Sequence, residues 1–306
     1  MKRIVVFYYT QSGQALSVAM NICKPLEDAS NEHGKEFDVV FKEIKSCQKY
    51  PFPWTKYEFF DSFPETRLGQ PPSGIESIDF SDVQDAELVI VVGQSWYLSP
   101  SLPIQSFFED ENVKTYLHSR NVIFVNACRN MWLMTKKRIK EYVSEVGANM
   151  VGHIVLQDGA PNLVSVVTIV RWLIEGRKEA TRWFPNAGIS EENIENASRF
   201  GDVIKQHLRT EDLTELQNSL LRAGAIHYKP SIMFMEKAGH RMFGLWAKFI
   251  RRKGEFRDKR RKNRVFAFYY YLLFVLFIVS PFGQLFFFLT YPLQNVPGNK
   301  QKDIHI

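Results

Sequence analysis

The first residues that could do chemistry form a short polar loop, Thr10-Gln11-Ser12-Gly13-Gln14, which follows the apolar run IVVFYY and leads straight into a helical pattern. Hydroxyl groups and free backbone N–H groups at the start of a helix bind anions, and glycine lets the backbone approach a phosphate closely. No lysine follows, so this is not an NTPase loop, and the GxGxxG pattern of dinucleotide-binding folds is absent. The loop predicts a phosphate-monoester site such as that for FMN, or else a plain capped turn.

Two more loops with polar and aromatic residues follow predicted strands, at residues 93–100 (GQSWYLSP) and 127–132 (ACRNMW). In a doubly wound parallel sheet both loops lie at the carboxyl edge, beside the point where ligands bind. An aromatic side chain there can stack on a planar ring, and an arginine can stabilise negative charge on a flavin pyrimidine. Simple packing is the alternative for the aromatic residues. The candidate cofactor contacts in these loops are Ser95, Trp96, Tyr97, Arg129 and Asn130.

Removal of a proton from a substrate needs a base at the same edge, and Asp158 directly follows the last predicted strand. It could accept that proton or simply begin a turn. Asn162 and Asn130 could hold carbonyl oxygens, and Arg129 could orient a carboxylate or a carbonyl through paired N–H donors. We therefore predict Arg129, Asp158 and Asn162 as the catalytic set. His153 lies within the strand and is expected to point into the core. No Ser-His-Asp arrangement or metal-binding cluster is readable.

Strands that alternate with helices must position these loops. Apolar runs at residues 3–9, 37–41, 87–92, 121–126 and 151–156 predict the strands, and the pattern favours an α/β fold with a parallel sheet in the order 2-1-3-4-5. Helices are expected at residues 136–146, 162–175, 191–208 and 211–222. The proline-rich stretch 48–73 predicts an excursion over the sheet edge with one short helix near residues 54–60. The globular domain is predicted to cover residues 1–225.

Charge and cysteine content narrow the function classes. The net charge is +6, but residues 251–264 hold nine Lys or Arg and two acids, so the rest of the chain is near −1. The main domain is therefore not expected to bind nucleic acid. Three scattered cysteines, Cys23, Cys47 and Cys128, indicate neither a disulfide framework nor a zinc site and fit a reducing compartment.

The C-terminal part predicts membrane attachment. Residues 265–293 contain no charge, and a spanning helix needs about 20 mostly apolar residues. Pro281 and Gly283 interrupt the run, so the segment either spans the bilayer as a kinked helix or turns back; a buried core helix is the alternative. We predict a basic amphipathic linker at 226–264, with residues 234–250 flat in the interface, an anchor at 265–293 and a polar tail at 294–306. Basic residues beside the anchor predict the cytoplasmic face of the inner membrane.

The motifs resemble known families. The Thr10–Gln14 loop is similar to the phosphate loop of flavodoxins and flavodoxin-like reductases, with Ser12 and Ala15 in place of two threonines, which removes hydroxyl donors. Residues 51–65, 95–103, 129–133, 146–158 and 162–169 resemble the bacterial DarA family of dialkylresorcinol and flexirubin-type pigment biosynthesis, over roughly residues 1–205. This resemblance implies a flavodoxin-like fold, FMN, and an aromatase that oxidises a cyclic dione made by a partner ketosynthase. A homodimer is a further expectation.

Two function classes stay open at this stage. The first is an oxidoreductase for a hydrophobic ring compound with alkyl chains, which partitions into lipid and would suit a membrane-bound enzyme. The second is a membrane-tethered electron carrier, and an NAD(P)H:quinone reductase lies between the two. A carrier usually presents an acidic docking face, so the charge near −1 outside residues 251–264 counts against it.

Overall fold

The computed structural model describes residues 1–34, 36–291 and 296–306. Its parallel strands are β1 (Lys2–Tyr8), β2 (Phe37–Glu43), β3 (Leu88–Trp96), β5 (Asn121–Cys128) and β6 (Asn149–Gln157), in the order β2-β1-β3-β5-β6. The short strand β4 (Ser99–Pro100) pairs antiparallel with the end of β3. Counting the parallel strands alone, the order is 2-1-3-4-5, that of the flavodoxin-like doubly wound fold. The predicted fold class is confirmed.

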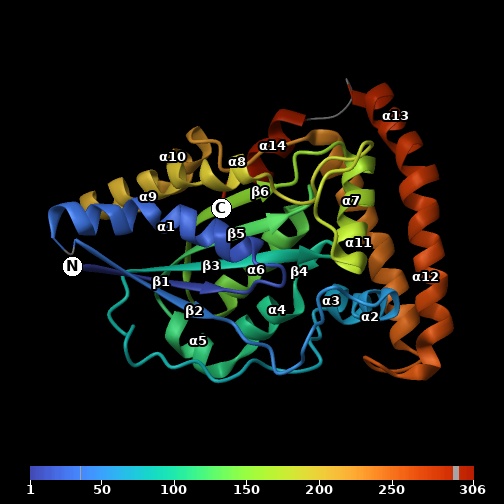
Figure 1. Ribbon diagram of the computed structural model, residues 1–306, viewed down its shortest axis with the longest axis horizontal. Helices are drawn as coiled ribbons and strands as arrows, with labels where there is room; N and C mark the ends of the chain where they lie inside the picture. Colours follow the sequence, from blue (N-terminus) through green and yellow to red (C-terminus); the bar gives the residue numbers. More distant parts are fainter. Residues whose placement is uncertain (35, 292–295) are drawn as a thin grey trace.

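The sheet is the centre of two apolar layers, which is why its strands read as solid apolar runs. Ile4 and Val6 of β1 face one layer, whereas Val5 and Phe7 face the other, and all four are fully buried. The first layer is covered by α1 (Gln14–His33), α8 (Glu191–Glu195), α9 (Ser198–Thr210) and α10 (Leu216–Arg222). The second is covered by α4 (Leu102–Glu109), α5 (Glu111–Leu117) and α6 (Leu133–Glu145) (Figure 1).

Several predicted helices differ from those observed. The excursion at 48–73 contains two short helices, α2 (Lys56–Asp61) and α3 (Phe63–Leu68), instead of one. The helix predicted at 191–208 is divided into α8 and α9, and the next helix begins at Leu216 rather than at 211. Helices α4 and α5 were not predicted, although Asp110 caps α5 through hydrogen bonds from the amides of Asn112 and Val113. The helix α7 (Asn162–Glu175) has its predicted bounds.

The C-terminal part consists of α11 (Pro230–Arg251) and one long apolar helix. The latter comprises the turn η1 (Lys259–Arg261), α12 (Lys262–Phe274), the π-helical turn η2 (Val275–Val279) and α13 (Ser280–Thr290). Pro281 lies in the first turn of α13, where proline fits, so it does not end the helix. By length and composition, residues 259–290 form a helix able to cross a membrane. Residues 292–295, where the predicted anchor ends and the polar tail begins, lie outside the described residues; α14 (Val296–Ile304) follows.

Helix α11 occupies most of the predicted linker and packs on the α/β domain. Its Phe243, Ala247 and Ile250 are buried in a cluster with Phe60 of α2 and Phe63 of α3. Arg67 of α3 also donates to the carbonyl oxygen of His240 on α11, at 2.8 and 3.0 Å. The domain boundaries at residues 225 and 264 themselves stay predictions. What the structure establishes is that α11 is held by contacts along its length.

The carboxylate of Glu236 on α11 caps the first turn of α6. It is fully buried and accepts hydrogen bonds from the amides of Leu133 (3.2 Å) and Met134 (2.8 Å). Burial raises the pKa of Glu236 to about 7, while the amides of Met134, Leu133 and Trp132 oppose the shift. Helix α6 directly follows the loop that carries Arg129. The C-terminal region thus holds one of the three candidate loops in place.

This buried acid predicts a pH-dependent stability. A carboxyl pKa that is higher in the folded than in the unfolded chain contributes stability at pH 5, and that contribution is lost as the pH rises through about 7. Compared with Glu236→Gln, the wild type should lose on the order of 2 kcal/mol of unfolding free energy between pH 5 and 8. Urea unfolding in detergent at both pH values measures this, with Glu141→Gln, exposed on α6, as the control. An unchanging difference between the two proteins would mean that Glu236 stays ionised throughout.

Candidate functional site

The Thr10–Gln14 loop has the backbone expected of an anion site. Gly13 lies in the left-handed region (φ 86°, ψ −24°), and a Cβ there would meet no atom within 4 Å, so the space beside the loop is open. In the described part of the chain, no side chain caps the start of α1. The Thr10 hydroxyl oxygen is buried and has no hydrogen-bond partner among the described residues. Free amides at a helix start together with an unpaired hydroxyl suit an anionic oxygen.

A second segment, residues 176–190, closes over the start of α1. The Gln14 side chain donates to the carbonyl oxygen of Ile189 at 2.9 Å and accepts from the Ile189 amide at 3.1 Å. Gly188 has φ 83°, and a Cβ there would lie 2.7 Å from the Trp172 ring and 2.8 Å from Gln14 Oε1. Only glycine fits between these groups. Gln11 is also bound, because its side chain donates to the carbonyl oxygen of Pro51 at 3.1 Å.

The loop after β3 is a tight hairpin turn into β4. Tyr97 and Leu98 both have positive φ (48° and 62°), as in a type I′ turn. The Ser95 hydroxyl lies 2.8 Å from the Thr135 hydroxyl and donates to Asn126 Oδ1 at 3.0 Å. The Tyr97 phenol donates to the carbonyl oxygen of Phe59 at 2.7 Å. Both polar groups are therefore used within the protein, and their proposed role toward a cofactor stays a prediction.

Trp96 lies in an aromatic group at the same edge of the sheet. Its ring centroid is 6.1 Å from that of Tyr9, 5.4 Å from Tyr50 and 5.5 Å from Trp54, all three edge-on. Tyr50 in turn lies 6.4 Å from Phe256 of the basic segment. Trp96 is only half-buried, which keeps it a candidate neighbour of a planar ring. The proline-rich excursion thus supplies aromatic residues to this edge.

Arg129 is the hub of the third loop. Its Nη1 donates to the carbonyl oxygen of Asn162 (2.9 Å), to Asn162 Oδ1 (2.8 Å) and to the Ser165 hydroxyl (3.0 Å). Asn130 Nδ2 donates to the same Asn162 Oδ1 at 2.7 Å. Burial lowers the pKa of Arg129 to about 10, so the guanidinium stays charged at neutral pH. The structure thus brings together three predicted residues, Arg129, Asn130 and Asn162.

Asp158 lies beside this hub. Its amide donates to the carbonyl oxygen of Arg129 at 2.9 Å, and its Oδ1 accepts from the Ala160 amide at 2.8 Å. Burial raises the pKa of Asp158, whereas the amides of Ala160 and Gly188 and the charge of Arg129 lower it. Its Oδ2 and the Asn130 Oδ1 are buried without a hydrogen-bond partner in the described part of the chain. Such unpaired oxygens are costly unless a ligand or water meets them.

Gly188 connects the two halves of the site. The Gly188 amide lowers the pKa of the Asp158 carboxyl, and a side chain at Gly188 would collide with the Gln14 side chain that begins α1. The phosphate-type loop and the Arg129 cluster therefore lie on either side of one residue, at the carboxyl edge of the sheet. Sequence reasoning missed Gly188 and Ser165. Ser165 follows Asn162 by three residues and so shares its helix face, a signal that could have identified it.

His153 is placed in the core, as expected. It is fully buried, its ring is parallel to Phe124 at 5.9 Å, and burial lowers its pKa well below the usual range. A neutral histidine without access to solvent cannot exchange protons with a substrate. Among the described residues, no group of three or more His, Cys, Asp or Glu could hold a metal ion.

These residues fit an FMN in part. The open space at Gly13, the unpaired Thr10 hydroxyl and the uncapped α1 suit its phosphate, and the unpaired oxygens of Asn130 and Asp158 suit polar ring atoms. The internal bonds of Ser95 and Tyr97 leave Trp96 as the ring neighbour offered by the β3 loop.

No protein-family model and no curated protein matches the chain. Solved structures that resemble it include a flavodoxin from the domain Archaea, at 14% identity and TM-score 0.38, covering 68% of this chain and 99% of that one. A flavoprotein in complex with FMN from Lactobacillus acidophilus has 19% identity and TM-score 0.37, covering 51% and 93%. An azoreductase from Bacillus anthracis has 10% identity and TM-score 0.35, covering 66% and 99%. The fold assignment rests on the strand order and not on these likenesses.

Proposed function

We propose that the chain is a membrane-associated, FMN-dependent oxidoreductase that oxidises a cyclic dione to a dialkylresorcinol. The observation that carries the proposal is the cluster of Arg129, Asp158 and Asn162 at the carboxyl edge, which Gly188 links to the Thr10–Gln14 loop. Ligands of doubly wound sheets bind at this edge. The resemblance of residues 1–205 to the DarA family supplies the substrate class.

The residues of the cluster suit this reaction. A bound flavin would supply the acceptor for a hydride, that is two electrons and one of the two protons that leave the ring. Asp158, whose pKa burial raises, would take the other proton. Asn162 shares its Oδ1 with Arg129 and Asn130, so its amide is oriented to donate to a ring carbonyl. The positive charge of Arg129 would stabilise the negative charge of a bound, reduced flavin.

The electron-carrier alternative differs in one respect: a carrier passes electrons to a protein and oxidises no small molecule. The same fold would suit a carrier. The net charge near −1 outside residues 251–264, however, counts against an acidic docking face. A quinone reductase would use the same cluster with the direction of electron flow reversed. The ketosynthase partner, the homodimer and the cytoplasmic face of the membrane are further parts of the proposal.

FMN binding is tested with the purified protein and with a variant at Thr10. Detergent-purified protein should be yellow and release FMN, identified by mass spectrometry. Thr10→Val keeps the shape of the side chain but removes its hydroxyl, so FMN should bind roughly 10- to 100-fold more weakly, the worth of a hydrogen bond to a charged group. Thr115→Val, at an exposed site on α5, is the matched control. Folded protein that neither contains FMN nor quenches its fluorescence would contradict the proposal.

Turnover separates the enzyme from the carrier. Anaerobic addition of an alkyl-substituted cyclohexanedione should bleach the bound flavin and yield one resorcinol per flavin. Asp158→Asn should bind FMN but slow this bleaching by roughly 100-fold, the usual contribution of a general base. Bleaching by a reduced protein partner or by NAD(P)H, with no reaction of the dione, would favour the carrier or the quinone reductase instead.

A further inference from the structure

The long apolar helix, residues 259–290, has one side packed on the protein. Val265, Phe268 and Phe287 are buried, and the Phe268 ring stacks on Phe63 of α3 at 3.7 Å. The helix runs antiparallel to α11. Phe268 lies beside Trp246, the Ser280 hydroxyl contacts the sulfur of Met235, and Phe287 lies beside Phe234. It therefore lies along the protein for its whole length (Figure 1).

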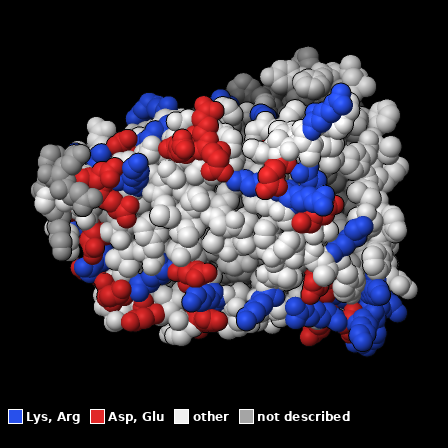
Figure 2. Space-filling model, in the orientation of Figure 1, with Lys and Arg blue, Asp and Glu red and all other residues white. Residues whose placement is uncertain are grey.

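The opposite side of this helix is apolar and open. A helix of 32 residues is about 48 Å long at 1.5 Å per residue. Monomeric soluble proteins rarely expose a continuous apolar surface of this extent. Figure 2 shows an almost uncharged edge where α12 and α13 lie, with basic residues gathered at its lower end. The exposed apolar residues include Tyr270, Phe274, Phe282, Leu285, Phe288 and Leu289.

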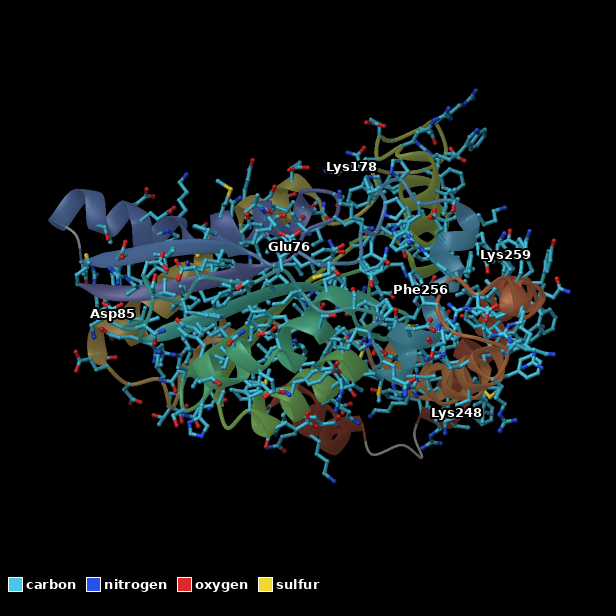
Figure 3. The ribbon with its side chains drawn as sticks, turned by 90° about the horizontal axis from the view of Figure 1, so that it is seen from below. Glu76, Asp85, Lys178, Lys248, Phe256 and Lys259 are labelled. Carbon is cyan, nitrogen blue, oxygen red and sulfur yellow. The ribbon has the colours of Figure 1, made fainter. Side chains whose placement is uncertain are left out.

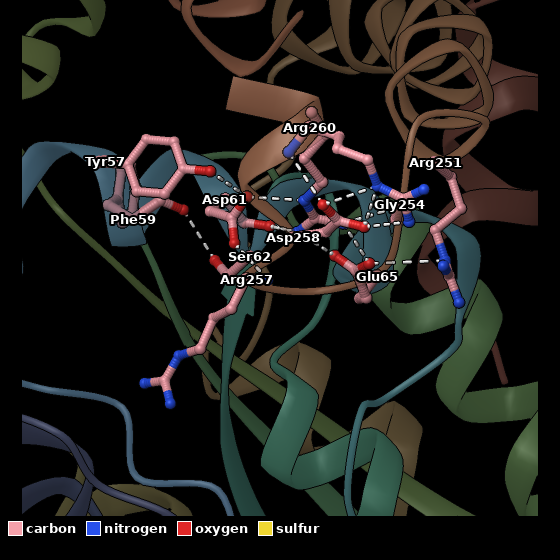
Figure 4. A network of polar contacts seen from close by, with 11 residues as sticks. Tyr57, Phe59, Asp61, Ser62, Glu65, Arg251, Gly254, Arg257, Asp258 and Arg260 are labelled. Atoms are coloured by element: carbon pink, nitrogen blue, oxygen red, sulfur yellow. Dashed lines mark hydrogen bonds and ion pairs between the residues drawn. The ribbon is translucent and has the colours of Figure 1, made fainter. Parts of the chain in front are cut away.

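Both ends of the helix are fastened to the same α/β domain. At its start, Arg261 is fully buried and donates to the carboxylates of Asp61 and Glu65. Figure 4 shows the polar network around these two carboxylates. Beyond the end of the helix, the chain returns to α6 and α11. Lys136 donates to the carbonyl oxygen of Asp303 at 2.7 Å, and Lys237 pairs with the Asp303 carboxylate at 2.9 Å. A helix that crossed about 30 Å of hydrocarbon would carry residues 296–306 away from these partners.

The rest of the protein also prevents a perpendicular insertion. Helix α11 lies beside the apolar helix and carries Lys237, Arg241 and Lys248, which would enter the hydrocarbon with it. Charges at the centre of a bilayer are costly. At the surface the same basic residues are favourable, because Lys and Arg attract anionic headgroups. Lys248 and Lys259 lie at the α11–α12 end of the molecule, opposite Asp85 (Figure 3).

We propose that residues 259–290 form an in-plane anchor: the helix lies flat in one leaflet of an anionic membrane, with the α/β domain and the C-terminus on the same side. This rests on the membrane association in the proposed function and specifies its form. An in-plane helix normally presents a polar face to water. In this helix, that side is covered by the rest of the protein instead. Tyr97 and Leu98, in the loop after β3, pack against the same aromatic cluster as α12. The candidate site is thereby held at the lipid surface, where an alkyl-chain substrate collects.

Depth measurements test the in-plane anchor. In a Cys47→Ser background, Tyr270→Cys, Phe282→Cys and Leu289→Cys carry an NBD label at sites exposed by 67, 69 and 73%. In vesicles of phosphatidylcholine and phosphatidylglycerol, spin-labelled lipids should quench all three labels at one depth, about 5–10 Å below the headgroups. A spanning helix would separate Tyr270 from Leu289 by about 28 Å, at opposite interfaces. Asp85→Cys, at the far end, should show no quenching.

The side of the C-terminus gives a second, independent result. Wild-type Cys47 is exposed and marks the α/β domain, whereas Cys23 and Cys128 are buried. A membrane-impermeant maleimide should label Cys47 in the wild type and Ile306→Cys in the Cys47→Ser background from the same face. Labelling from opposite faces, or a graded depth, would overturn the in-plane anchor. Yellow protein that does not float together with vesicles would overturn the in-plane anchor but not the proposed cofactor. Colourless folded protein would contradict the proposed cofactor.

Discussion

Replacing Arg261 with methionine should lower the free energy of unfolding by about 3–5 kcal/mol, the usual cost of removing one partner from a buried ion pair. The Arg261 side chain has no exposed surface. Its Nε donates to Asp61 Oδ1 at 2.7 Å, and its Nη1 and Nη2 donate to Glu65 at 2.6 and 3.0 Å. Burial raises the pKa of Glu65, and Arg261 opposes that shift. Without the guanidinium, two carboxylates would remain buried together, and Arg251, whose Nε lies 3.5 Å from Glu65, would be the remaining ion-pair partner there.

The effect should reach well beyond residue 261. Asp61 also accepts from the Arg257 amide at 2.8 Å, so the whole turn before α12 depends on this group (Figure 4). Arg260→Met, one residue away and exposed, is the matched control and should leave the melting temperature unchanged. Arg261→Met combined with Asp61→Asn and Glu65→Gln should recover part of the loss, because no uncompensated charge remains. A wild-type urea midpoint for Arg261→Met alone would show that water reaches these carboxylates.

Arg129→Met should slow oxidation of the dione by roughly 100- to 1,000-fold, the cost of removing one preorganised donor from a charge-stabilising site. It should also lower the midpoint potential of the bound flavin by at least about 30 mV, which for two electrons corresponds to about 1.4 kcal/mol. The reason is the charge of Arg129, which is retained at neutral pH despite burial. Potentiometric titration of the flavin absorbance measures the shift.

A second variant separates charge from structure. Arg129 also holds the first turn of α7 through Asn162 and Ser165, so Arg129→Met should cost about 1–3 kcal/mol of stability as well. Arg129→Lys keeps the charge but not the paired donors. It should share the loss of stability while its flavin potential stays near that of the wild type. Arg177→Met, exposed just beyond the end of α7, should change neither quantity. Equal potentials in all four proteins would limit Arg129 to a structural role.

The sequence alone predicted the features that depend on short stretches of chain. Apolar runs marked the five parallel strands, because a strand covered on both faces has no polar position to interrupt it. The turn between β1 and α1 could be recognised in the sequence from Gly13, the residue that occupies the left-handed region there. Residues that follow strand ends, such as Arg129 and Asp158, could be placed at one edge because parallel strands end together. The uncharged run at 265–293 marked the long apolar helix, whose length and composition would allow it to cross a membrane.

Tertiary structure decided what depends on residues far apart in sequence. Nothing local shows that Arg261 pairs with Asp61 and Glu65, about 200 positions earlier, or that Glu236 caps α6. Within the basic residues at 251–264, nothing in the sequence distinguishes Arg261, which is fully buried in the fold. Ser95 and Tyr97 have the composition of ligand contacts, but their bonds to Thr135, Asn126 and Phe59 are set by neighbouring elements. Hydropathy is summed along the helix and says nothing about its sides. Only packing against α11 shows which side of residues 259–290 is covered by protein and which side is exposed.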